Sequence, residues 1–253
     1  MLVIKHHKGF TLVELLTVIA IVAVLGAILI PTVSKMKTQA NAVEGTNNLR
    51  NIGTALNLYA ADADGYLPRV SIKKSEWNAD NPDDQVTADQ MWSKLLRDYL
   101  PQQSLSKTSR AHKVFGCPNA EYYDSSGRIV DKDDISLSYT ATEAIYGIRI
   151  LSTGPARDSK SQRHLSTIEE PSNTVIVTDG KQQSTAYTSC RSSTVWSQLL
   201  GDIQTNPESA SYIDFRQPGQ SANVLYVDGH VGRLSFDEFQ ELDEQDWTGR
   251  PQS

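Results

Sequence analysis

Two aspartates and a histidine have the types and spacing to form a catalytic or metal-binding group. Asp179 and Asp228 each end an apolar segment and precede a glycine, and His230 follows the second Asp-Gly pair. Paired carboxylates with an imidazole can transfer protons or hold a metal, provided that the two segments lie side by side. An Asp-Gly pair is also typical of a tight turn, because glycine readily adopts a positive φ. The sequence favours turns, and a hydrolase that gathers all three residues in one cleft is an alternative.

Other candidates for chemistry are weaker. His112 and His164 lie alone in polar stretches, where we expect them to be solvated. Asp62-Ala63-Asp64-Gly65 is similar to the start of a calcium loop but lacks the third carboxylate and the distal glutamate, so a helix-ending turn is favoured. The sequence has no glycine-rich phosphate loop, no metal-spaced cluster of cysteine and histidine, and no nucleophile elbow. We therefore expect no enzyme, no catalytic residue, no cofactor and no metal, with calcium as a minor alternative.

The composition averages two different parts of the chain. The 253 residues carry a formal net charge of -6 and are 39% hydrophobic. Such a mildly acidic chain is not typical of nucleic-acid-binding proteins, which carry basic patches. Phe10–Ile30, however, contains 21 residues, of which 17 are apolar and only Thr11, Glu14 and Thr17 are polar apart from one glycine. As a helix this segment rises about 32 Å, enough to cross a hydrocarbon core of about 30 Å.

The apolar segment predicts a membrane anchor. A cleaved secretory signal has an apolar region of only about 7–15 residues followed by a cleavage site, and a soluble core helix is rarely so apolar all round. Lys5 and Lys8 supply positive charge before the segment. Because cytoplasmic flanks carry an excess of Lys and Arg, residues 1–9 are expected in the cytoplasm and the bulk of the chain outside it.

Glu14 is anomalous because it lies inside the apolar segment. A charged side chain at the centre of a membrane helix costs about 2.5–3.5 kcal/mol, so an ionisable residue there indicates a function by default. Glu14 could instead snorkel to the nearby membrane edge. We favour pairing with a cation in a medium of low dielectric, for which an N-terminal amine freed nearby would serve.

Cys117 and Cys190 form an even pair, 73 positions apart. Export to an oxidising compartment would permit a disulfide. Its loop closure could then add up to about 4 kcal/mol to the free energy of unfolding. The alternative is two separate thiols, buried or partly exposed, and the sequence leaves both open.

Gly9-Phe10-Thr11-Leu12-Val13-Glu14, after a short basic leader, resembles the prepilin processing motif of type IV pilins and type II secretion pseudopilins. The resemblance implies that a prepilin peptidase cuts between Gly9 and Phe10 and that Phe10 is then N-methylated. It also implies that Glu14 neutralises the terminal amine of a neighbouring subunit as the helix leaves the membrane for a filament. Pro31 matches the family's helix-interior proline, which removes one backbone bond and kinks or loosens the helix. Cleavage would remove both leader lysines and change the formal net charge to -8.

The helix is expected to continue past Pro31 and to end by Asp64-Gly65, where glycine can cap it. Apolar residues recur every three or four positions along it, first at Val33, Met36, Ala40 and Val43, then at Leu49, Ile52, Leu56, Tyr59 and Ala63. Such a stripe predicts an amphipathic helix that packs on a sheet. The slip in phase near Gly45–Asn48 indicates a bend or a change of contact face. The segment from Asn48 to Pro68 also resembles the helix end of pseudopilin-like proteins.

The remainder is rich in polar loops. Val175–Asp179 and Val224–Val227 predict buried strands, each followed by an Asp-Gly hairpin turn, and His230–Leu234 predicts a return strand. Helical spacing is present in Ala88–Leu100, and Val114–Pro118 predicts a short strand entering a turn.

The acidic segment Asp237–Trp247 predicts a short amphipathic helix, with a calcium-stabilised loop as the alternative. The class predicted is therefore α+β, with a long helix packed on a small antiparallel sheet.

The segment Ala222–Val231 resembles the C-terminal signature of a large group of prepilin-motif proteins, in which a histidine precedes an Asn-Val-Leu-Phe-x-Asp-Gly-His-Val run. This chain has Gln217 or Pro218 at the place of that histidine. A role tied to that histidine is therefore not implied here.

Four parts are expected: a cleaved leader at 1–9, a transmembrane and filament-core helix at 10–30, its amphipathic continuation at 31–65, and a periplasmic or extracellular head at 66–253. The resemblance implies a structural subunit of a type II secretion or type IV pilus-like filament, inserted once in the inner membrane. Implied partners are prepilin peptidase/methyltransferase, other pilin-like subunits, an inner-membrane assembly platform and membrane lipid, and not nucleic acid. The alternative is a membrane-tethered binding protein that uses prepilin processing without polymerising.

Overall fold

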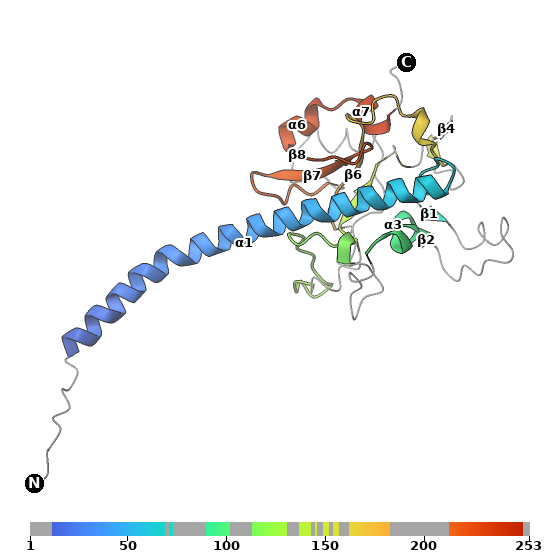
Figure 1. Ribbon diagram of the computed structural model, residues 1–253. Coiled ribbons are helices and arrows are strands. Elements are labelled where there is room, and N and C mark those ends of the chain that lie inside the picture. Colours follow the sequence, from blue (N-terminus) through green and yellow to red (C-terminus); the bar gives the residue numbers. More distant parts are fainter. Residues whose placement is uncertain are drawn as a thin grey trace, which may run out of the picture. The chain divides into compact units, whose positions relative to one another are not determined.

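A computed structural model describes residues 12–68, 71–72, 90–101, 113–130, 137–142, 145, 149–151, 154–156, 162–182 and 213–249 (Figure 1). The chain divides into two compact units, Met1–Ala40 and Asn41–Ser253. Helix α1, Leu12–Asp62, contributes residues to both units. The other described elements belong to the second unit, so the predicted α+β arrangement of a long helix and an antiparallel sheet is confirmed.

A four-stranded antiparallel sheet organises the second unit. Its strand order is β3-β6-β7-β8, formed by Tyr139–Ala141, Val175–Asp179, Ser221–Tyr226 and Val231–Ser235. Thr178 of β6 pairs with Val224 of β7, and Val224 pairs in turn with Gly232 of β8. The two predicted apolar strands and the return strand are therefore present. There are also two two-stranded sheets among the described residues. One pairs β1, Ser71–Ile72, with β2, Gln90–Met91, and the other pairs β4, Arg149–Leu151, with β5, Gly154–Ala156.

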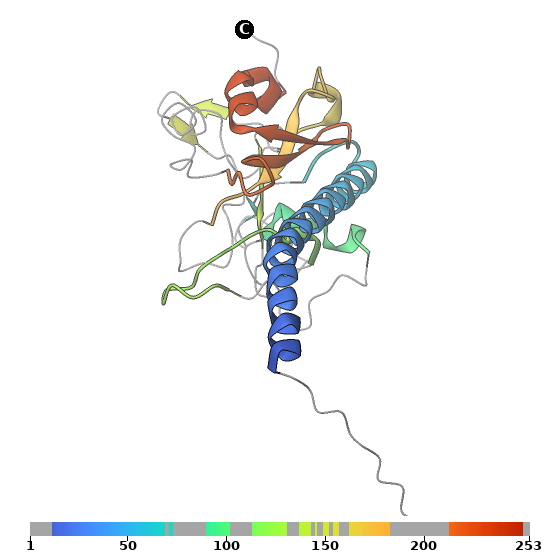
Figure 2. The ribbon, with the colours of Figure 1, turned by 90° about the vertical axis from the view of Figure 1, so that its left-hand side faces the viewer.

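Helices cover both faces of the four-stranded sheet (Figures 1 and 2). Side chains alternate along β7, so that Leu225 joins the core on the α1 side and Val224 joins the core on the opposite side. The second core is closed by α6, Phe236–Glu241, and α7, Glu244–Thr248, through Phe239 and Trp247. Burial on both faces explains why Val175–Val177 of β6 and Val224–Leu225 of β7 are consecutive apolar residues in place of an alternating pattern.

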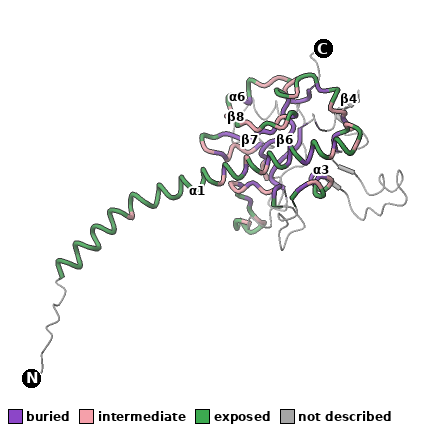
Figure 3. Tube along the Cα trace, in the orientation of Figure 1, coloured by how far each residue is buried: buried purple, intermediate pink, exposed green. Residues whose placement is uncertain are grey.

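The part of α1 in the second unit buries one face (Figure 3). The predicted stripe holds from Leu49 onward, but Val43 is 58% exposed, so its predicted place on the packed face is wrong. Small and large residues are interspersed on this face, whose buried positions are Ala42, Gly45, Leu49, Ile52, Gly53, Ala55, Leu56 and Ala60. The helix comes close to the sheet at Gly53, where a Cβ would lie 3.0 Å from Cδ1 of Leu225. The face that packs on the sheet therefore includes small residues that allow close approach, and a hydrophobic pattern alone does not identify them.

Helix α1 ends at Asp62, just before the Asp64-Gly65 pair where its end was predicted. Asp64 and Gly65 adopt φ values of 50° and 88°, which turn the chain out of the helix. The Gly65 amide donates to the Ala60 carbonyl at 2.7 Å and so satisfies one of the last helical acceptors.

Two predicted elements differ from the structure. Val114–Pro118 is not a strand, because Lys113–Phe115 forms the 3₁₀ helix η3, which buries both Val114 and Phe115. Two apolar side chains can be buried by one turn, and Pro118 has no amide for a strand ladder. The helix expected within Ala88–Leu100 is shorter and broken into α3, Trp92–Leu95, and the 3₁₀ helix η1, Arg97–Tyr99.

The acidic C-terminal segment forms two short helices where one was expected. Ser235 and Glu238 make a reciprocal capping box at the start of α6, and Asp243 and Asp246 make another at the start of α7. Gly249, with φ of 60°, ends α7. Part of the acidic charge of this segment therefore stabilises helix N-termini.

The packing of α1 yields a matched pair of variants. Ile52→Ala should lower the free energy of unfolding of the second unit by about 2–5 kcal/mol, because it opens a cavity in the core. Leu58→Ala, on the exposed face of the same helix, should change that free energy by less than about 0.5 kcal/mol. Urea titration of the full chain in detergent, followed by tryptophan fluorescence, measures both, and equal effects would contradict the assigned face.

Candidate functional site

The apolar start of α1 is the first candidate for a functional surface. Every large apolar side chain from Leu12 to Ile30 is at least half exposed, and this part of the helix is long and apolar enough to cross a membrane. The residues of a soluble core helix would be mostly buried. Glu14 lies in the first turn, and Pro31 lies in the helix interior with helical residues on both sides. This surface therefore requires lipid or protein from outside the described chain.

Several predicted site residues lie outside the described residues. They are Gly9 and Phe10 at the expected cleavage point, together with Cys190 and His112. Cleavage, methylation and the Cys117–Cys190 disulfide therefore stay predictions. Cys117 itself is buried.

The hydrolase alternative required Asp179, Asp228 and His230 in one cleft, and the structure separates them. Asp179 ends β6 beside the start of β7, whereas Asp228 lies in the turn after β7 and donates its amide to the Pro171 carbonyl before β6. The antiparallel pairing of β6 with β7 thus sends the two carboxylates to opposite ends of the sheet. The three residues do not form a catalytic group.

The turn predicted at Asp228-Gly229 is present. Gly229 has φ of 93°, and its amide donates to the Tyr226 carbonyl at 3.0 Å. Asp228 Oδ1 accepts from the amide of His230 at 3.0 Å and lies 2.6 Å from its Nδ1, which therefore carries the proton. The imidazole stacks on Tyr226 with ring centroids 4.1 Å apart. These contacts order the hairpin.

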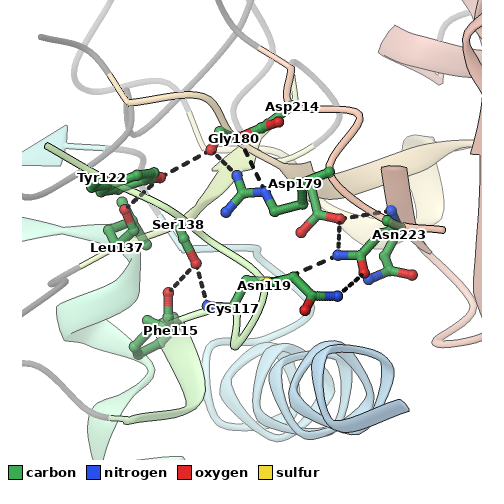
Figure 4. Close-up of polar contacts among 12 residues, drawn as sticks. Phe115, Cys117, Asn119, Tyr122, Leu137, Ser138, Asp179, Gly180, Asp214 and Asn223 are labelled. Carbon is green, nitrogen blue, oxygen red and sulfur yellow. Dashed lines mark hydrogen bonds and ion pairs between the residues drawn. The ribbon is translucent and has the colours of Figure 1, made fainter. Parts of the chain in front are cut away.

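Asp179, in contrast, was wrongly predicted as a turn residue. It is the last residue of β6 and is fully buried. Its Oδ2 accepts from the amide of Asn223 at 2.8 Å and from Nε2 of Gln217 at 2.9 Å. Asp179 is therefore the centre of a buried polar cluster (Figure 4).

An arginine completes the charge pattern of this cluster. Arg216 forms an ion pair between Nε and Asp214 Oδ2 at 3.2 Å and donates through Nη2 to the Gly180 carbonyl. Its guanidinium lies 5.8 Å from the centroid of the Tyr122 ring, whose hydroxyl donates to the same carbonyl at 2.9 Å. Arg216 therefore offsets part of the cost of burying the Asp179 carboxylate.

Four buried atoms of the cluster have no hydrogen-bond partner within the part of the chain that the structure describes. They are Asp179 Oδ1, Asn223 Nδ2, and Nη1 and Nε of Arg216, of which Nε has only its ion-pair contact with Asp214. A buried unpaired polar atom costs about 1–3 kcal/mol. The cluster thus contains more buried polar atoms than its own hydrogen bonds satisfy. This excess makes it a candidate site.

Helix α1 covers the cluster at Gly45. A Cβ at that position would lie 3.3 Å from Asn223 Nδ2 and 3.5 Å from Cys117 Sγ. Tyr139 donates its hydroxyl to the Gly45 carbonyl at 3.4 Å, and Asn48 Nδ2 donates to the Gly116 carbonyl at 3.2 Å. The cluster is therefore sealed by a helix that has no side chain at the point of contact.

Burial dominates the protonation of the cluster. It raises the pKa of Cys117 to about 11, with a further increase from the negative charge of Asp179. Burial also raises the pKa of Asp179, although Arg216 and the donors Asn223 and Gln217 oppose this rise. The thiol is therefore protonated at neutral pH.

His164, which we expected to be solvated, is partly exposed and also holds the end of α1. Ser166 donates its amide to Nδ1 at 3.1 Å, so the proton lies on Nε2, which donates to the Asp64 carbonyl at 2.9 Å. The ring also packs edge-on against Tyr66. A side chain at Gly65 would clash with this ring. The isolated histidine in the sequence gave no sign of these long-range partners.

Calcium was considered as an alternative at Asp62–Gly65 and in the acidic segment Asp237–Trp247. In the described ranges, no group of three or more His, Cys, Asp and Glu side chains is close enough to hold a metal ion. Asp64 contributes its carbonyl to His164, and Asp243 and Asp246 serve the α7 capping box.

Sequence reasoning missed Arg216 as a member of the buried cluster and gave Gln217 no role. Gln217 was noted only as a position where related signatures have a histidine, and that substitution was the available signal.

Comparison with known proteins finds similarity at the N-terminus. Residues 4–30 match the prokaryotic N-terminal methylation motif. The type IV major pilin protein PilA of Myxococcus xanthus is 37% identical over 61 residues, covering 24% of this chain and 28% of that protein. The type IV wide pilus major component PilA4 of Thermus thermophilus is 40% identical over 62 residues, covering 24% and 47%. The type II secretion system core protein G of Pseudomonas aeruginosa is 31% identical over 62 residues, covering 24% and 44%.

These matches confirm the predicted resemblance for the N-terminal part of the chain. The chain spans less than half the length of each of these three relatives. No solved structure matches the chain. The comparisons thus bear on α1 and leave the sheet and its polar cluster to be interpreted from their own geometry.

The buried cluster predicts a specific pH dependence. Because the pKa of Asp179 is raised in the folded state, its contribution to stability is complete below about pH 4 and is lost as the pH rises through the folded pKa. Asp179→Asn keeps an acceptor for Asn223 and Gln217, so the wild type should lose stability relative to this variant as the pH rises. Urea unfolding between about pH 3.5 and pH 7 measures the difference. Asp237→Asn, on the exposed face of α6, is the control, and parallel profiles for wild type and Asp179→Asn would contradict the assignment.

Proposed function

We propose that this chain is a structural subunit of a type IV pilus-like or type II secretion-like filament. The observation that carries the proposal is the exposed apolar surface of α1 with Glu14 in its first turn, within residues that match the methylation motif. Similarity of the N-terminal part to pilins and to a secretion core protein supports the same assignment.

The apolar surface requires two successive environments. Burial of a large aliphatic side chain contributes about 1.5–3 kcal/mol, so Leu12–Ile30 cannot remain in water. Before assembly, lipid of the inner membrane surrounds this segment, with residues 1–9 in the cytoplasm and the head in the periplasm. After assembly, the same segments of neighbouring subunits replace the lipid. Repetition of one non-closing contact then produces an open filament.

Processing supplies the cation that Glu14 requires. A prepilin peptidase/methyltransferase cuts between Gly9 and Phe10 and methylates the new amine, which stays charged. In the low dielectric of the filament core, the Glu14 carboxylate of one subunit pairs with the Phe10 amine of its neighbour. An inner-membrane assembly platform moves the processed subunit from lipid into the filament.

The mature N-terminus tests the processing step. Mass spectrometry of the protein isolated from its native membrane should find Phe10 as the first residue, carrying one methyl group on its amine. Gly9→Leu should block cleavage and leave the leader attached, because the peptidase must accommodate the residue before the cut. Thr11→Ser is the matched control and should be processed normally. An intact Met1 in the wild type would refute the processing class.

Glu14 tests assembly separately from processing. Glu14→Ala should leave leader cleavage intact but reduce incorporation into filaments by about tenfold or more, since even about 1.4 kcal/mol of lost pairing is tenfold in an equilibrium. Glu44→Ala, an exposed position on α1 beyond the apolar segment, is the matched control. Sheared filaments and membranes are compared by immunoblot.

Normal incorporation of Glu14→Ala would contradict the pairing role. Wild-type protein that is processed and methylated but never enters a filament would favour the membrane-tethered binding protein. The two experiments therefore distinguish failure of processing from failure of assembly.

A further inference from the structure

Helices α6 and α7 together lie across the face of the four-stranded sheet that α1 does not cover (Figure 1). We call residues 236–249 the strap. Its anchors, Phe239 and Trp247, are buried in a core that they share with Val175, Ile213, Ala222 and Val224. Within the described ranges, no buried side chain belongs both to this core and to the core beneath α1. The strap can therefore leave the sheet without disrupting the packing of α1.

One arginine holds the far end of the strap. Arg163 is 7% exposed, and its guanidinium donates to the carbonyls of Thr248 and Gly249, the second at 2.7 Å. The backbone of Arg163 lies outside the strap, because its carbonyl accepts from the amide of Leu67, just after α1, at 2.8 Å. The side chain that binds the strap is thus fixed to the part of the unit that α1 organises.

Two features of the closed strap oppose closure. Nε1 of Trp247 is buried and has no hydrogen-bond partner among the residues that the structure describes, whereas water would satisfy this donor in an open strap. Asp246 lies near the negative charges of Asp243 and Glu170. Burial and then these two charges raise the pKa of Asp246, although its bond with the Asp243 amide opposes the rise. Closure therefore brings like charges together and leaves one buried donor unsatisfied.

We propose that the strap opens as one unit while α1 stays packed on the sheet, and that Arg163 is the latch that keeps the strap closed. The stability of a folded protein is divided among cooperative segments of this kind, which open with different free energies. In the open state Phe239 and Trp247 leave the sheet together, and the apolar face of β6 and β7 beneath them is uncovered. Hydrogen bonds from a charged donor are stronger than neutral ones, so loss of the Arg163 contacts favours the open state.

Hydrogen exchange of the full chain in detergent, read by mass spectrometry of its peptides, tests the wild type. Peptides from α6 and from α7 should show one common protection factor, at least about tenfold lower than that of peptides from β7 and from residues 49–56 of α1. Simple fraying would protect α7 less than α6. Such a gradient, or equal protection of the strap and β7, would overturn the proposal. Neither readout depends on filament assembly.

A latch variant and its control locate the restraint. Arg163→Met keeps an unbranched apolar stem but removes the charged donors. It should lower the protection of the strap by about tenfold or more and change that of β7 by less than about twofold. Arg50→Met is the matched control, since Arg50 is exposed on α1 and donates to Asn47, and it should leave the strap unchanged. An equal loss of protection in the strap and in β7 on Arg163→Met would contradict the latch.

A second variant should act in the opposite direction. Asp246→Asn keeps an oxygen that accepts from the Asp243 amide but removes one of the like charges, so the protection of the strap should rise by about threefold. A fall in protection on Asp246→Asn would contradict the assigned repulsion. Because the first comparison uses the wild type, it decides whether the strap opens as one unit even where a variant does not fold.

Discussion

The burial of one face of α1 against the sheet is the contact on which the described second unit depends. Leu49, Ile52 and Leu56 fill the core between the helix and the central strands, and all three are almost fully buried. Packing against a helix is one of the ways in which strands as short as β6 and β7 gain stability. Gly45 and Gly53 allow the helix backbone to come close enough for this packing. His164 then fixes the point where the helix stops, because it holds the Asp64 carbonyl.

The part of α1 before Ala40 needs a different environment from the part after it. Its early residues are apolar on all sides, whereas its later residues are apolar on one side only. An all-round apolar surface suits lipid or a bundle of like helices, and a single stripe suits a sheet. The transition occurs within an unbroken helix, so the change in side chains along one element determines which environment each part can occupy. The polar residues that surround Val33 and Met36 mark this transition.

Local patterns in the sequence predict the elements but not the polar cluster. Periodicity is a property of neighbouring residues, which is why α1, the two apolar strands and the turn at Asp228-Gly229 could be predicted. Asp179-Gly180 has the same local chemistry, yet Asp179 lies in a strand because its partners Gln217 and Asn223 come from a distant segment. The contact of His164 with the Asp64 carbonyl was missed for the same reason, since the two residues are 100 positions apart. A buried polar residue such as Asp179 is likewise defined by contacts that only the completed topology supplies.

The polar contacts between α1 and the rest of the second unit fix the register of the helix along its axis, which the apolar stripe alone does not fix. Residues spaced by three and four repeat along a helix, so a stripe of this kind would tolerate a slip by one turn of about 5.4 Å. The hydrogen bonds of Asn41, Asn48 and the Gly45 carbonyl with fixed groups of the unit would all break in such a slip. Buried polar groups often stabilise less than apolar ones of the same shape. Their presence beneath Gly45 is therefore explained by the register that they impose on α1.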